Sequence, residues 1–71
     1  MTTDDLLQAL TQVTSTSDAR ALVSRAMRIT GAPNHRPLQL TELVQMCEAL
    51  GVEGGPIQRL AETIAMAALR D

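Results

Sequence analysis

The sequence predicts an all-α fold in which the whole chain of 71 residues forms one compact domain of four helices. Apolar residues recur at intervals of three and four along four segments, as they do on one face of an α-helix. Residues that begin or end helices separate these segments. The chain contains no Phe, Tyr or Trp, so Leu, Ile, Val, Met and Ala must supply the core. We expect helices near residues 4–14, 18–30, 40–50 and 56–70.

Hydroxyl side chains are expected to bound the first two helices. Thr2 or Thr3 can cap the first helix, and the run TSTS of residues 14–17 should end it, because Ser and Thr side chains compete for backbone hydrogen bonds. Ser17 is the expected cap of the second helix, and Gly31 its left-handed exit. The expected buried faces are Leu6, Leu7, Leu10 and Val13 in the first helix and Ala19, Leu22, Val23, Ala26 and Ile29 in the second.

The last two helices follow the loop GAPNHRP of residues 31–37. Thr41 is the expected cap of the third helix and Gly51 its terminal glycine, with Val52 packing back beneath the turn. Pro56 suits the first turn of the fourth helix. The expected buried faces are Leu43, Met46, Cys47 and Leu50 in the third helix and Ile57, Leu60, Ala61, Ile64 and Ala68 in the fourth.

Few residues of this sequence are suited to catalysis or to metal binding. The single cysteine, Cys47, excludes a disulfide within the chain, and on an apolar face a free thiol behaves as a small hydrophobe. His35 has no partner at metal-ligand spacing, and residues 15–17 have no activating base nearby. We therefore expect a protein that is not an enzyme and that uses neither a cofactor nor a small-molecule substrate.

The sequence also indicates where the protein works. Residues 1–5 carry two acids and no cation, which is unlike a signal peptide. No apolar run approaches the roughly 18 residues that a membrane helix needs. We expect a cytoplasmic protein that does not enter a membrane.

The formal charge of −2 is unevenly distributed, because acids dominate both ends of the chain and arginines its middle. The arginines of the middle are Arg20, Arg25, Arg28 and Arg36. They either pair with acids of neighbouring helices or form a site for an anion or a partner. Helical spacing places Arg20, Ser24 and Arg28 in one exposed row, with Met27 beside it.

Residues 37–64 look like the core of the helix-turn-helix family. The lead-in PLQLTELV is similar to the loop, cap and first apolar residue of such units, and the later positions of the pattern are Cys47, Leu50, Gly51, Val52, Ile57 and Leu60. Two helices that meet steeply need a small residue at the crossing and a glycine in the turn. The resemblance implies that Gln58 and Arg59 would read base edges in the major groove of DNA. The sequence departs from the pattern in its reading surface, where an acid and two glycines stand, and it has no lysine to bind phosphates.

The run IAMAAL of residues 64–69 is apolar on all sides of the fourth helix. A helix of this kind needs burial all round, whereas a terminal helix of a small bundle can hide only one face. The alternative interpretation is an ordinary surface with scattered Met and Ala. We expect self-association through this end of the chain, and the residues concerned are Ile64, Met66, Ala67 and Leu69.

These observations predict a helical protein–protein interaction module that forms a homo-oligomer, most simply a homodimer, and also binds another protein. The alternative is a small helix-turn-helix DNA-binding transcriptional regulator. The surroundings of Gln58 and Arg59 discriminate between the two functions. A surface continuous with the arginines of residues 20–28 favours DNA, and a surface ringed by Glu48, Glu53 and Glu62 favours a protein.

Overall fold

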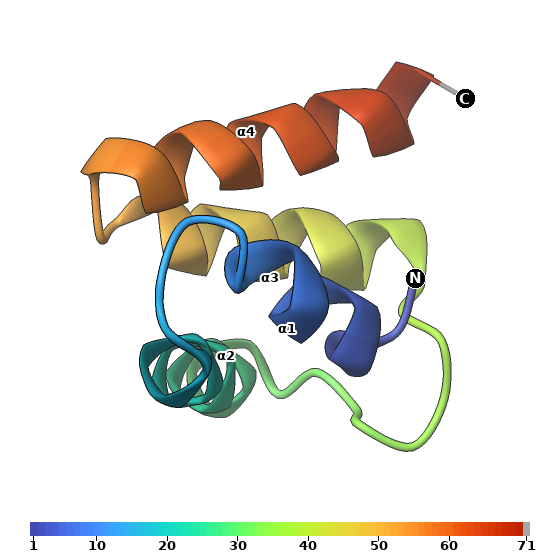
Figure 1. Cartoon of the computed structure of the whole chain (residues 1–71). Coiled ribbons are helices and arrows are strands. Elements are labelled where there is room, and N and C mark those ends of the chain that lie inside the picture. Colours follow the sequence, from blue (N-terminus) through green and yellow to red (C-terminus); the bar gives the residue numbers. More distant parts are fainter. Residues whose placement is uncertain (71) are drawn as a thin grey trace.

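The computed structural model describes residues 1–70 and contains four helices in that range, with no strand among those residues. They are α1 (Thr3–Leu10), α2 (Thr16–Thr30), α3 (Leu40–Gly51) and α4 (Gly55–Arg70). Figure 1 shows α4 lying along one side of the molecule above α3 and running in the opposite direction, with α2 on the other side of α3 and α1 in front. The all-α prediction is therefore confirmed, and α3 occupies the middle of the arrangement.

The first helix begins as predicted but ends earlier. The backbone N–H of Asp5 donates to Oγ1 of Thr2 at 3.2 Å, and the N–H of Thr2 donates to the Asp5 carboxylate at 2.9 Å. In this capping box each side chain satisfies the backbone N–H of the other residue. The predicted end at residue 14 is wrong, because α1 stops at Leu10. The N–H groups of Gln12 and Val13 each bond to the carbonyl three residues back, which tightens the chain into a turn.

The second helix starts two residues before its predicted beginning. The cap is Ser15 and not Ser17, since Oγ of Ser15 accepts the backbone N–H of Asp18 at 3.1 Å. The exit is confirmed: Gly31 has a φ of 72°, in the left-handed region that glycine adopts without steric cost. Its N–H donates to the carbonyl of Met27 at 2.7 Å and closes the last turn.

The turn between α3 and α4 differs from the predicted one. Gly51 lies inside α3, and the positive φ angles fall on Gly54 (74°) and Gly55 (57°). The chain therefore changes direction three residues later than expected, and Val52 is 80% exposed instead of packing beneath the turn. Pro56 does lie in the first turn of α4, as predicted.

The predicted start of α3 at residue 40 is confirmed, but its cap was placed two residues too late. Gln39 is the N-cap, and Thr41 lies within the helix. The N–H of Gln39 donates to Oε1 of Glu42 at 2.8 Å, so the acid three residues after the cap satisfies the backbone N–H of the cap residue.

The core is built around α3, which contributes all four of its predicted residues. The fully buried larger side chains come from α1 and α3, and they are Leu6, Leu10, Met46 and Leu50. In contrast, the only residue of α4 that is fully buried is Ala61. The predicted apolar face of α4 packs against the core through partly buried side chains, which are Ile57, Leu60, Ile64 and Ala68.

Two residues of the predicted faces lie outside the core. Val13 follows the shortened α1 and is exposed, and Ile29, near the end of α2, is 65% exposed. The loop after α2 returns to the core through Leu38, which is buried and whose N–H donates to the Met1 carbonyl at 2.7 Å. Over residues 1–70, the helices are all too short or too polar to cross a membrane.

Candidate protein-binding surfaces

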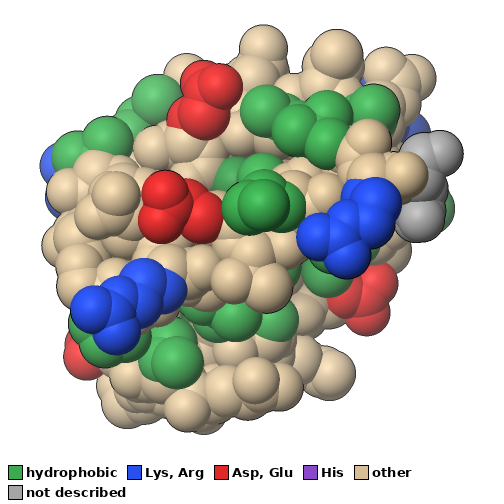
Figure 2. Space-filling model, turned by 90° about the horizontal axis from the view of Figure 1, so that it is seen from above, with side chains coloured by type: hydrophobic (Ala, Val, Ile, Leu, Met, Phe, Trp, Pro, Cys, Tyr) green, Lys and Arg blue, Asp and Glu red, His purple; other side chains and the backbone are tan. Residues whose placement is uncertain are grey.

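An open groove of about 430 Å³ runs between α3 and α4. Its floor contains Cys47 and Ala61, whose side chains are 4% and 1% exposed. The other residues that line it are Val44, Glu48, Gly51, Val52, Gln58, Glu62 and Ala65. Figure 2 shows the side of the molecule that carries α4, where hydrophobic side chains reach the surface between acidic and basic ones. The groove is thus apolar at its base and carries two acids.

Cys47 is held in this floor by the helical spacing of α3. Its place in the core between α3 and α4 was predicted and is confirmed. Burial raises the pKa of the Cys47 thiol, because the thiolate would lose its hydration. The thiol therefore stays neutral at physiological pH and acts as a small packing group.

The C-terminal part of α4 leaves apolar side chains on the outside. Met66 and Leu69 are each 61% exposed, and Ala67 is also exposed. Ile64, which the sequence grouped with them, instead packs partly against the core. The four predicted self-association residues are thus divided between two sides of the helix, and only Met66, Ala67 and Leu69 are accessible to a second molecule.

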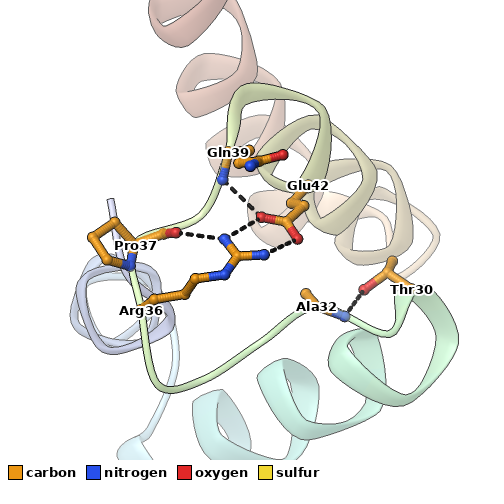
Figure 3. Close-up of polar contacts among 6 residues, drawn as sticks. All are labelled: Thr30, Ala32, Arg36, Pro37, Gln39 and Glu42. Carbon is orange, nitrogen blue, oxygen red and sulfur yellow. Dashed lines mark hydrogen bonds and ion pairs between the residues drawn. The ribbon is translucent and has the colours of Figure 1, made fainter.

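Two of the four arginines in the middle of the chain pair with acids. Figure 3 shows the guanidinium of Arg36 against the carboxylate of Glu42, with N–O distances of 3.0 and 2.9 Å, while Nη1 also donates to the carbonyl of Pro37 at 3.0 Å. The hydrogen bonds from Arg36, and to a smaller extent the one from the N–H of Gln39, stabilise the carboxylate and hold the pKa of Glu42 below its ordinary value. The same bonds raise the pKa of Arg36. This cluster fastens the loop of residues 31–39 to the first turn of α3.

Arg25 makes a weaker pair with Glu53, in which the closest N–O distance is 3.4 Å and the arginine side chain is largely exposed. The pair joins α2 to the turn before α4. It also neutralises the one acid that the helix-turn-helix resemblance placed at the front of the reading surface.

The other two arginines remain on the exposed face of α2, as the helical spacing predicts. Arg20 borders a shallow hollow of about 240 Å³ that Asp4 and Asn34 also line. Arg28 borders a second hollow, and Met27 and Ser24 line both. The structure thus gathers the row Arg20, Ser24 and Arg28 on one surface.

Gln58 and Arg59, the predicted DNA-reading residues, lie on the first turns of α4. Gln58 lines the groove together with Glu48 and Glu62, whereas Arg59 is exposed and does not line it. Glu53, the third predicted acid, lies in the preceding turn. The charged residues that line the groove with Gln58 are therefore acids of α3 and α4, and the arginine row of α2 borders other hollows.

Sequence reasoning missed several residues of these surfaces. Val44 lines the groove one turn before Glu48, and the spacing of four between them could have revealed this edge of α3.

Within residues 1–70, no three His, Cys, Asp or Glu side chains lie close enough together to hold a metal ion. Comparisons with families of related proteins, with curated proteins and with solved structures found no match for this chain.

Proposed function

We propose that this protein is a non-enzymatic helical interaction module that binds other proteins, including a second copy of itself, through the side of the molecule formed by α4. The observation that carries the proposal is the one-sided packing of α4. Its inner face lies on α3, while Met66 and Leu69 on its outer part are each 61% exposed. An apolar helix surface of this kind is typical of a contact with a second helix.

The composition explains why such a contact would stabilise the protein. A chain of 71 residues without aromatic side chains can bury little apolar area by itself. Fully burying a Met or Leu side chain stabilises a fold by about 1.5–3 kcal/mol. At 61% exposure, about 1–2 kcal/mol per side chain is still to be gained at Met66 and at Leu69 if a partner covers them completely.

The dependence of thermal stability on concentration tests the proposal. If the dimer is more stable than the monomer, the Tm measured from helix circular dichroism rises between about 5 and 500 µM protein, because association favours the folded state by mass action. A Tm that stays constant over this range would contradict self-association.

The second candidate is a helix-turn-helix DNA-binding regulator. Two observations favour it, namely the three-residue turn between α3 and α4 and the small, buried Cys47 where these helices pack. The acids that line the groove beside Gln58 oppose it, because they would approach phosphates. We therefore expect no duplex to bind more tightly than about 1 µM at physiological salt. Nanomolar affinity for one duplex in a fluorescence titration, lost in Arg59→Ala, would reverse this ranking.

A further inference from the structure

We infer that the second copy binds in one register: the α4 helices of the two chains pack antiparallel, with Met66 at the two-fold axis and Glu62 of each chain facing Arg70 of the other. The inference rests on the proposed self-association and adds to it a contact geometry and a set of charge pairs. It follows from the order of three exposed side chains along α4.

These three side chains form one ridge on the helix surface. Glu62, Met66 and Arg70 are spaced by four residues, and all three are exposed. Residues spaced by four form the ridges that interdigitate in the commonest class of helix packing. Leu69 lies beside this ridge, whereas Ile64 and Ala65 face the interior and pack partly against the core.

The order of charges along the ridge selects the antiparallel arrangement. An acid stands four residues before Met66 and an arginine four residues after it. A two-fold axis at Met66 reverses the direction of the second ridge, so the acid of each chain lies at the height of the arginine of the other. In a parallel arrangement in the same register, Glu62 would face Glu62 and Arg70 would face Arg70, which like-charge repulsion opposes.

The acid of this ridge has no competing partner in the described chain. Two other glutamates, Glu42 and Glu53, are in ion pairs with arginines. Glu62 forms neither an ion pair nor a side-chain hydrogen bond within residues 1–70. Its carboxylate can therefore accept an arginine from a second chain without breaking an existing contact.

A charge exchange tests the register. Glu62→Arg alone and Arg70→Glu alone each place like charges opposite one another at two symmetric positions. Each should weaken the dimer by about 10-fold or more in Kd at low salt. The double variant Glu62→Arg/Arg70→Glu restores opposite charges and should return Kd to within about 3-fold of the original value. Asp18→Arg, in the exposed first turn of α2, makes the same change of charge on a helix away from α4 and should leave Kd unchanged.

Sedimentation velocity with interference optics measures these dissociation constants, because the chain has no Tyr or Trp for detection at 280 nm. Circular dichroism of each variant checks that α4 stays helical, since Arg70 also lies in the last turn of the helix, where a cation is favourable. Two outcomes would overturn the register while leaving self-association intact: a normal dimer in both single variants, or a double variant no stronger than they are. A wild-type chain that does not dimerise at all would overturn the proposed function itself.

Discussion

Replacing Met66 by Glu and Leu69 by Lys should separate the two copies without unfolding either one. Both side chains are 61% exposed, so their removal costs the single chain little packing, and the two new charges cancel. The dimer loses four apolar side chains. At about 1–2 kcal/mol each the loss would reach roughly 4–8 kcal/mol for complete coverage, and half of that if the partner covers them halfway. The lower estimate of about 2–4 kcal/mol corresponds to a Kd weakened by roughly 30- to 800-fold.

The assay is sedimentation equilibrium over a concentration series, with circular dichroism to confirm that the helix content is unchanged. The matched control carries Ile29→Glu and Val13→Lys, which introduce the same two charges at apolar residues that are 65% and 41% exposed outside α4. The control should dimerise like the wild type. If it weakens the dimer as much as the α4 variant does, or if the α4 variant dimerises normally, the reasoning about α4 is refuted.

Three further predictions concern the fold. Cys47, buried in the groove floor with a raised pKa, should react with a thiol reagent only after unfolding; Cys47→Ala should fold and Cys47→Arg should not, and rapid labelling of the native protein would contradict its placement. Ser15→Ala should lower the free energy of unfolding by about 1 kcal/mol in urea denaturation, whereas Ser17→Ala should have a much smaller effect, because the cap of α2 is Ser15. The pKa of the Glu42 carboxyl lies below its ordinary value of 4.5 in the folded protein. The stabilisation of the fold by the ionised carboxylate is therefore present above pH 4.5 and is lost as the pH falls through the lowered pKa. Stability measured across this acid range should therefore depend less on pH in Glu42→Gln, and an unchanged pH profile would contradict the pairing with Arg36.

The number, order and approximate limits of the helices could be predicted because apolar periodicity reports burial directly. The four core residues of α3 follow this rule. Gly31 could be predicted for another reason, since the left-handed end of α2 needs a residue that adopts a positive φ without steric cost. The predicted N-caps of α2 and α3 failed for a different reason. Ser15 and Ser17 are chemically equivalent in the sequence, and only the path of the preceding turn decides which of them reaches the open N–H groups.

The surfaces were harder to predict than the core. The exposure of Met66 and Leu69 agrees with the expectation from the run of residues 64–69, since a terminal helix has one neighbour to pack on. The sequence could not show that Gln58 would share a groove with Glu48, because this depends on the turn reversing at Gly54 and not at Gly51. Ion pairs between long side chains were also not predictable, because the pairing of Arg36 with Glu42 depends on how the loop between them folds.

Sedimentation equilibrium of the wild-type protein tests the self-association through α4 most directly. The mass of one chain is 7.6 kDa. At about 100 µM and physiological salt, we predict an average mass that rises with concentration toward twice this value. A mass that remains at 7.6 kDa at every concentration would contradict the account and leave Met66 and Leu69 without a second copy to cover them.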